Sequence, residues 1–139
     1  MILLDTNVVS ELMRPIPEPR VLAWLDAQPA ADVWISAITV GEIRLGIALL
    51  RDGQRKERLA GLAEAMFHED FSGRCLTYDM LAAAEYAAIV ATRTRLGRPI
   101  SVEDAQIAAI ARSGGLALAT RNTKDFSDID DVPLVNPWT

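Results

Sequence analysis

Three acidic residues stand far apart in the sequence, at positions where parallel strands would bring them together. Asp5 follows the apolar run Met1–Leu4, while Glu42 and Asp104 each stand near the start of a predicted helix. If the strands lie parallel, their carboxyl ends gather at one edge of the sheet, the usual place for a site in an open α/β fold. Carboxylates gathered there repel one another unless a cation lies between them, and hard oxygen ligands favour Mg²⁺ or Mn²⁺. The spacing therefore predicts a metal site built from these three acids.

Each acid also has a purely structural explanation. Thr39-Val40-Gly41-Glu42 and Ser101-Val102-Glu103-Asp104 match the capping box, in which an acidic group at the third helical position closes the start of a helix. Asp5 can likewise cap the short helix that follows it. Helical periodicity favours the functional interpretation, because both helix acids then share a face with apolar residues, where an unpaired charge is costly. These apolar neighbours are Ile38, Leu45, Gly46 and Leu49 for Glu42, and Ile107, Ala108 and Ala111 for Asp104.

The elements that must position these acids alternate between strand and helix. Short apolar runs bounded by turn residues predict strands, and longer stretches with apolar residues at helical spacing predict helices. The predicted strands are Met1–Leu4, Asp32–Ser36, Cys75–Tyr78, Leu116–Ala119 and Pro133–Asn136. The predicted helices are Val8–Met13, Pro19–Ala27, Thr39–Leu50, Gln54–Phe67, one that Asp79 caps and that runs to about Leu96, and Val102–Ser113. Strands separated by helices imply an α/β fold, a three-layer α/β/α sandwich around a small, mostly parallel sheet.

Length and composition indicate one globular domain over residues 1–139, in which 50% hydrophobic residues can form a core. No apolar stretch is long enough to span a bilayer, and Asp5 interrupts the N-terminal apolar run before a signal peptide could form. The single cysteine, Cys75, excludes an intrachain disulfide and indicates a cytoplasmic protein. The net charge of −5 and the pI of about 4.8 argue against binding nucleic acid through broad charge attraction. They do not argue against a nuclease whose acidic site takes its positive charge from a metal.

Four segments in order carry more information than any one of them alone. They are Met1–Asn7, Ser36–Glu42, Asp104–Ala111 and Ala119–Phe126, followed by the closing Val135–Trp138. Together they resemble the PIN-domain family, most closely the VapC-type and FitB-type toxins of type II toxin–antitoxin systems. The resemblance implies a small parallel sheet flanked by helices and a Mg²⁺- or Mn²⁺-dependent endoribonuclease. In the family's pattern Asp5, Glu42 and Asp104 form the metal site, where metal-activated water would cleave an RNA phosphodiester.

The fourth position of the family's site falls on Asn122, where many relatives carry an aspartate. An asparagine oxygen can coordinate the metal or orient a water but adds no negative charge, so we count Asn122 as catalytic and expect one firmly held ion. Asp125, three residues on, either supports this edge or lies in a solvated turn. The Thr6 hydroxyl stands beside Asp5 and is expected to hold a carboxylate or a water in place.

Basic residues must hold the RNA backbone. Arg121 and Lys124 flank Asn122, and Arg98 precedes the predicted helix that carries Asp104, so these three are expected, with Thr6, to bind substrate. A second basic group fits a solvated helix face better; its members are Arg51, Arg55, Lys56 and Arg58.

The resemblance also implies protein partners. A small cognate antitoxin would lay an amphipathic segment into a groove of the domain and block the site. The chain would form a homodimer through the apolar faces of helices between residues 39 and 66, and a heterotetramer or larger assembly with the antitoxin.

Two other classes of function stay open. An aspartate that closes the first strand also marks haloacid-dehalogenase-like phosphatases and other phosphotransferases, but these usually carry a second aspartate where this chain has Asn7. A PIN-like module that binds RNA or protein without cutting is the other, and the retained acids argue against it. Cleavage of a labelled RNA, release of inorganic phosphate, or neither would separate the three classes.

Overall fold

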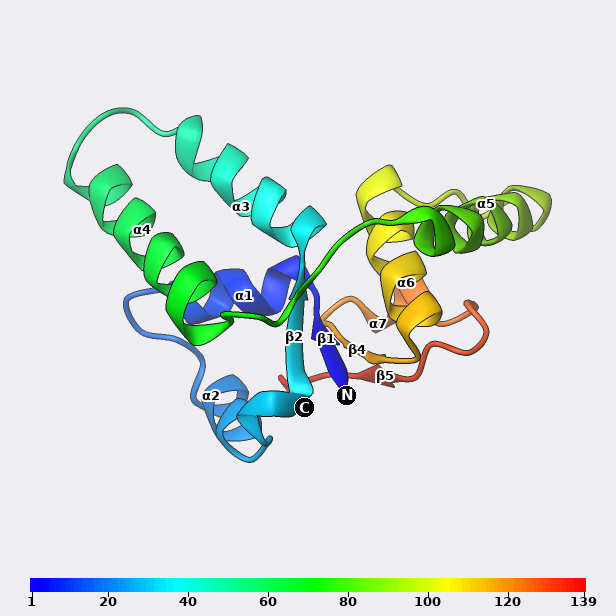
Figure 1. Ribbon diagram of the computed structural model, residues 1–139, viewed down its shortest axis with the longest axis horizontal. Coiled ribbons are helices and arrows are strands. Elements are labelled where there is room, and N and C mark those ends of the chain that lie inside the picture. Colours follow the sequence, from blue (N-terminus) through cyan, green and yellow to red (C-terminus); the bar gives the residue numbers. More distant parts are fainter.

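The chain folds around a five-stranded sheet in which each strand runs parallel to its neighbours (Figure 1). The computed structural model describes all residues, 1–139. The strands are β1 (Ile2–Leu4), β2 (Val33–Ser36), β3 (Cys75–Leu76), β4 (Ala117–Ala119) and β5 (Leu134–Val135). Their order across the sheet is β3-β2-β1-β4-β5, which places β1 at the centre. All five predicted strands are therefore present, although β3 and β5 are two residues long.

Seven α-helices connect and cover the strands. They are α1 (Thr6–Leu12), α2 (Pro19–Asp26), α3 (Ala37–Ala48), α4 (Gln54–Ala65), α5 (Met80–Arg95), α6 (Val102–Gly114) and α7 (Thr123–Phe126). A 3₁₀ turn over Ala30–Asp32 precedes β2, and a π-helical turn over Met66–Asp70 ends α4. Asp79 caps α5 as predicted, accepting the Ala82 N–H over 2.9 Å. The single turn of α7 is the one helix that the sequence did not predict.

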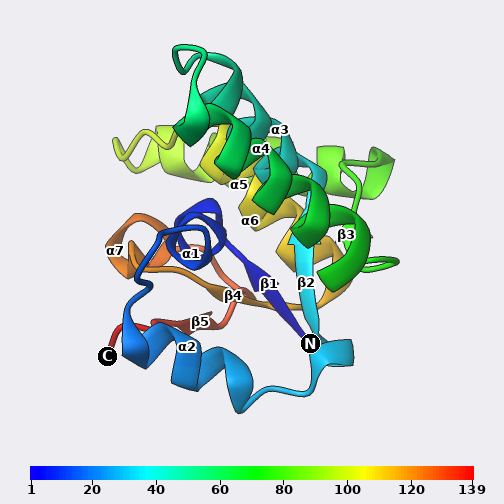
Figure 2. The same ribbon diagram turned by 90° about the vertical axis from the view of Figure 1, so that its left-hand side faces the viewer.

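The alternation of side chains along β1 divides the core into two halves. Leu3 lies in the half formed with α5 and α6, and Leu4 lies in the half formed with helices α1 to α4. Both leucines are fully buried, and each contributes about 1.5–3 kcal/mol through removal of its apolar surface from water. Figure 1 shows the two helical layers to the right and left of the strands, and Figure 2 looks onto the α1–α4 side. This arrangement confirms the predicted three-layer α/β/α sandwich.

Helix α3 turns a different face to the core from the one expected. Thr39 and Ile43 are buried, whereas Leu45 and Leu49 are 59% and 77% exposed. The expectation that Glu42 shares a buried stripe with these two leucines is wrong. Because apolar residues lie on nearly every side of this helix, periodicity could not identify the side that packs.

Helix α6 packs as expected. Ile107, Ala108 and Ala111 are fully buried, so Asp104 does lie at the end of a core-facing stripe. Gly115 ends the helix in the left-handed conformation, with φ of 69°, a geometry that glycine adopts without steric cost.

The carboxyl ends of β1 and β2 meet the starts of α1, α3 and α6 at one edge of the sheet, at the top in Figure 1. No helix of the fold combines the length and the apolar character needed to cross a membrane.

Candidate metal and catalytic site

Asp5 lies at the centre of this edge, directly after β1. Its N–H donates to the Ala119 carbonyl of the neighbouring β4 over 2.9 Å, and the residue is only 4% exposed. Its carboxylate accepts three hydrogen bonds: one from the Thr6 N–H to Oδ1 at 2.8 Å, and two to Oδ2 from the Thr120 hydroxyl at 2.8 Å and the Asn7 amide at 3.3 Å. Asp5 therefore caps α1, as its structural explanation requires, but the cap uses one oxygen only and the buried carboxylate is fixed by all three donors.

Glu42 is held beside Asp5 by hydroxyl groups. The Thr6 hydroxyl donates to Oε1 of Glu42 over 2.8 Å, and since that hydroxyl has one hydrogen, Thr39 Oγ1 must donate to Thr6 over the 2.9 Å between them. The capping explanation of Glu42 is wrong, because α3 begins at Ala37 and its cap is Ser36, whose hydroxyl accepts the Thr39 N–H over 3.2 Å. The carboxylate of Glu42 is thus free of any helix-capping role.

Asp104 lies at the third position of α6, opposite α3. Its N–H donates to the capping hydroxyl of Ser101 over 3.1 Å, so the first half of the capping box is present. The Asp104 residue is half-buried, whereas its neighbour Glu103 is exposed, so Asp104 is the more enclosed of the two adjacent acids.

The electrostatics of the edge show that the acids are close enough to repel one another. Burial raises the pKa of Asp5 to about 6; hydrogen bonds from Thr120 and Thr6 oppose this rise, and the charges of Asp104 and Glu42 add to it. Burial also raises the pKa of Asp104, and the nearby carboxylates of Asp125 and Glu103 raise it further. A cation at this edge would relieve both effects.

The donor set suits a hard divalent cation, but the acids do not close around one point. No group of three or more His, Cys, Asp or Glu side chains is close enough to hold an ion by itself. All nearby donors are oxygens, the ligands that Mg²⁺ and Mn²⁺ prefer, and Mg²⁺ usually keeps several waters while binding one or two carboxylates. An open, oxygen-lined edge fits that kind of binding, with Asp5 and Asp104 as the direct candidates.

Two polar residues that support Asp5 were not singled out from the sequence. The Thr120 hydroxyl donates to Asp5 and also accepts the Asn122 N–H over 3.1 Å, while the Asn7 side chain accepts the Arg121 N–H over 3.3 Å. The position of Thr120 directly after β4 could have identified it, because β4 pairs with β1 and the residues that follow both strands share one edge.

An uncharged residue, Asn122, occupies the fourth position of the family's site. Asn122 is exposed and caps α7 without a side-chain hydrogen bond. Asp125, on α7, lies near enough to Asp104 to raise its pKa. The structure therefore brings Asp125 within electrostatic range of Asp104 and leaves Asn122 exposed.

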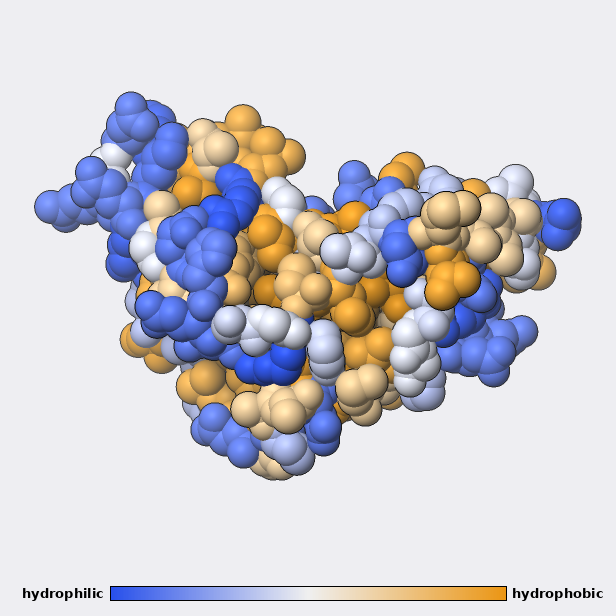
Figure 3. Space-filling model, in the orientation of Figure 1, coloured by the Kyte–Doolittle hydropathy of each residue, from blue (hydrophilic) through white to orange (hydrophobic).

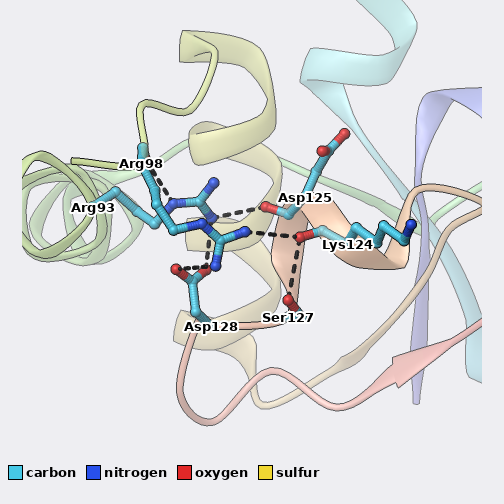
Figure 4. Close-up of polar contacts among 6 residues, drawn as sticks. All are labelled: Arg93, Arg98, Lys124, Asp125, Ser127 and Asp128. Carbon is cyan, nitrogen blue, oxygen red and sulfur yellow. Dashed lines mark hydrogen bonds and ion pairs between the residues drawn. The ribbon is translucent and has the colours of Figure 1, made fainter. Parts of the chain in front are cut away.

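The predicted phosphate-binding residues differ in whether their cationic groups already contact other side chains. The Arg98 guanidinium pairs with Asp128 over 2.9 Å, and that of Arg121 lies over the Trp138 ring at 5.1 Å from its centroid. Lys124 is exposed, and its ammonium extends away from the arginines (Figure 4). Thr6 directs its hydroxyl to Glu42, so it positions a carboxylate rather than presenting a free group to substrate.

A cavity of about 740 Å³ adjoins Glu42 between α1, α3 and α4. Thr6 and Glu42 form part of its wall, and basic and apolar side chains form much of the rest. The basic residues are Arg14, Arg55 and Arg58, and the apolar ones are Met13, Ile43, Ile47, Leu50 and Leu59. Arg55 and Arg58, which the sequence analysis assigned to a solvated helix face, therefore line a groove that leads to the candidate site.

Comparison with known proteins agrees with this geometry. The sequence profile of the PIN domain matches residues 2–132. The chain is 47% identical to toxin FitB of Neisseria gonorrhoeae over 138 residues, with 99% of both chains covered. It is 39% identical to the VapC ribonuclease Y4jK of Sinorhizobium fredii over 138 residues, with 99% of this chain and 98% of the relative covered. It superposes on the crystal structure of FitAcB from Neisseria gonorrhoeae with a TM-score of 0.86 at 45% identity, covering 99% of each chain. These similarities cover nearly the whole chain and agree with its parallel sheet and with the acids at the carboxyl edge. The chain therefore belongs to the PIN-domain family.

Proposed function

We propose that this protein is a divalent-metal-dependent endoribonuclease and the toxin of a toxin–antitoxin pair, acting in the cytoplasm. The observation that carries the proposal is the buried Asp5 carboxylate, which three donors hold beside Glu42 and within range of Asp104. The relatives that match nearly the whole chain are named as a toxin and as a ribonuclease, which supports the same activity here. Membership of the PIN family sets aside the dehalogenase-like alternative.

In the proposed site, Asp5 and Asp104 would bind Mg²⁺ or Mn²⁺ and Glu42 would complete the set of acids. When bound, the cation supplies an acidified water and neutralises the charge that develops on the scissile phosphate. Thr6 fixes Oε1 of Glu42, which leaves Oε2 able to accept the proton of the attacking water. Thr120 and Asn7 keep Asp5 in one orientation throughout. Attack by that water in line with the 3′-oxygen would break the bond between this oxygen and phosphorus, giving a 5′-phosphate and a 3′-hydroxyl without help from the RNA 2′-hydroxyl.

The cavity beside the acids is the proposed docking place of the antitoxin. An amphipathic segment could pack apolar side chains against Ile43, Ile47 and Leu59 while its acidic groups meet Arg55 and Arg58. Because Glu42 and Thr6 lie in the same wall, an occupant of the cavity would also obstruct the site.

A homodimer is proposed through the exposed apolar faces of α3 and α4. Leu45 on α3, Leu49 at the C-cap of α3 and Leu62 on α4 are large apolar side chains left exposed in the monomer. Figure 3 shows apolar surface in the hollow between the α3–α4 arm and the α5–α6 arm. One such dimer with its antitoxin chains would form a heterotetramer, and two dimers joined by antitoxin chains would form a larger complex.

The decisive experiment incubates the purified chain with a 5′-labelled RNA, with and without Mg²⁺ or Mn²⁺. We expect cleavage that depends on the metal, stops with EDTA and is absent in Asp5→Asn. Metal-dependent binding of RNA without cleavage would identify a non-cutting module instead. Equal cleavage by the wild type and Asp5→Asn would show that Asp5 is not the centre of the site.

A further inference from the structure

A buried arginine lies behind the candidate site, at the end of α5. Arg93 is only 4% exposed, and a buried guanidinium is costly unless its N–H groups are paired. Its Nε donates to the Arg98 carbonyl over 2.8 Å, and its Nη1 donates to the Asp125 carbonyl and to Oδ1 of Asp128, each over 2.8 Å. One side chain thus joins the end of α5, the turn before α6, and the segment that contains α7.

Asp128 is shared between two arginines of different burial. Its Oδ2 accepts a hydrogen bond from Arg98 over 2.9 Å, and the Arg98 side chain is 48% exposed. Arg98 also donates to the Lys124 carbonyl over 3.4 Å, a longer contact than any that Arg93 makes. Arg93 is therefore the buried half of this cluster, and Arg98 is its solvent-facing half.

One contact of Arg93 is made to the main chain of Asp125 and leaves the Asp125 carboxylate unpaired with it. Arg93 binds the main-chain carbonyl of Asp125, and the Asp125 carboxylate points away from Arg93, Arg98 and Asp128 (Figure 4). That carboxylate lies close enough to Asp104 to raise its pKa, while the charge of Arg93 acts on Asp104 in the opposite direction. Arg93 thus acts on both residues without an ion pair to either carboxylate, because its ion pair is with Asp128.

We propose that Arg93 is a positioning residue for the metal site: it fixes the Asn122–Asp128 segment through the Asp125 carbonyl, so that the Asp125 carboxylate faces Asp104 and serves as the fourth acid. This assignment rests on the proposed metal-dependent function. Packing alone does not explain the residue, because Phe126 and Ile129 already anchor the segment in the core. What Arg93 adds is a hydrogen bond to the main-chain carbonyl of the residue that carries the acid, held in place by its bonds to the Arg98 carbonyl and to Asp128.

The test titrates Arg93→Lys and Arg98→Gln, each in the full chain, with Mn²⁺ alone. Steady-state RNA cleavage is measured for Arg93→Lys only, because Arg98 is itself a predicted substrate contact. Lysine keeps the charge but presents its donors from a single nitrogen, so it cannot reach the Arg98 and Asp125 carbonyls and Asp128 together. We expect the Mn²⁺ dissociation constant of Arg93→Lys to rise by about tenfold or more, with a similar fall in kcat and little change in KM. Arg98→Gln, which loses only an exposed pair, should change the dissociation constant by about threefold or less.

A folded Arg93→Lys protein that binds Mn²⁺ as tightly as the wild type would overturn the assignment. If Arg93→Lys does not fold, Asp128→Asn takes its place, because it weakens the ion pair of Arg93 as well as that of Arg98. The assignment requires Asp128→Asn to lose more Mn²⁺ affinity than Arg98→Gln, and equal losses would overturn it. A wild-type chain that binds no Mn²⁺ would instead overturn the proposed function together with this role for Arg93.

Discussion

Thr120 donates its hydroxyl hydrogen to Oδ2 of Asp5 over 2.8 Å across a sequence separation of 115 residues. The contact exists because β4 pairs in parallel with β1, so the residues that follow the two strands meet at the same edge. Thr120 also accepts hydrogen bonds from the Asn7 amide at 3.3 Å and the Asn122 N–H at 3.1 Å. One buried hydroxyl therefore links the central acid to the loop that carries the fourth site position.

Replacing Thr120 tests this link. Thr120→Val keeps the shape but removes the donor to a buried carboxylate, which should lower the free energy of unfolding by about 1–3 kcal/mol near neutral pH. Because Asp5 also loses its orientation, RNA cleavage should fall about 10–100-fold. Thr120→Ser, which keeps the hydroxyl, is the control for both urea unfolding and cleavage. Equal behaviour of the valine and serine variants would contradict the role assigned to the hydroxyl.

The raised pKa of Asp5 makes stability depend on pH in the absence of metal. The pKa is about 6 in the folded chain and 3.8 in an ordinary setting, so folding favours the protonated form. That stabilisation is complete below a pH of about 4 and is lost as the pH rises through about 6, at a cost of at most about 3 kcal/mol. In EDTA, the melting temperature of the wild type should therefore fall between pH 5 and pH 7.5 by more than that of Asp5→Asn, whose amide does not titrate.

The response of the melting temperature to added Mg²⁺ is a second test of Asp5. At pH 7.5 Mg²⁺ should raise the melting temperature of the wild type, because an ion bound only by the folded chain stabilises it, and it should leave Asp5→Asn nearly unchanged. Parallel pH profiles of the two proteins in EDTA, together with equal responses to Mg²⁺, would show that Asp5 carries no unfavourable charge.

Asp104 and Glu103 form a matched pair for mutation. Asp104→Asn removes a half-buried carboxylate that faces the other acids and should reduce cleavage to background, with the fold intact. Glu103→Gln removes an exposed carboxylate one residue away and should retain most of the activity. Cleavage rates at saturating Mn²⁺, with circular dichroism as the check on folding, measure both effects. A larger loss in Glu103→Gln would mean that the helix presents the other acid to the site.

The sequence predicted the parts of this site that depend on local pattern. The apolar run before Asp5 predicts a buried central strand, and the helix starts near Glu42 and Asp104 place their carboxylates near that strand's end. The orientation of α3 could not be predicted, because its apolar residues surround the helix and only its packing partners decide that Thr39 and Ile43 face inward.

The supporting contacts were missed for a different reason. The bonds from Thr120 to Asp5 and from Arg93 to the Asp125 carbonyl join residues far apart in the chain. The place of Thr120 directly after β4 could have identified it, but nothing in the sequence near Arg93 marks its contact. Arg93 in particular follows an alanine-rich stretch and resembles an ordinary basic residue near a helix end.

Gly46 offers a way to separate the proposed antitoxin groove from the catalytic acids. It lies in the wall of the 740 Å³ cavity, and a Cβ added there would meet no atom within 4 Å. Gly46→Leu should therefore fold normally while filling part of the groove. Gly61→Leu, on α4, has equally open surroundings but lies outside the cavity wall and serves as the control.

In cells, both glycine variants should arrest growth when expressed alone, if the protein is a toxin. Co-expression of the product of the neighbouring gene should relieve the arrest by the wild type and Gly61→Leu, and relieve Gly46→Leu poorly. Full relief of Gly46→Leu, with unchanged affinity for that product, would place the docking surface elsewhere.

The salt dependence of RNA binding tests how few cations hold the substrate. Arg98 is paired with Asp128 and Arg121 is stacked on Trp138, so Lys124 is the least committed of the three predicted contacts. Each phosphate contact on a single strand contributes about 0.7 to the slope of log K against log salt, and three contacts or fewer give a slope of no more than about 2.

Lys124→Ala should lower the slope by about 0.7, while Arg98→Gln should leave it nearly unchanged. Fluorescence anisotropy with the catalytically inactive Asp5→Asn protein over a range of salt concentrations provides the measurement. A steep slope shared by arbitrary RNA sequences would show that the chain binds through a broad basic surface, which a net charge of −5 argues against.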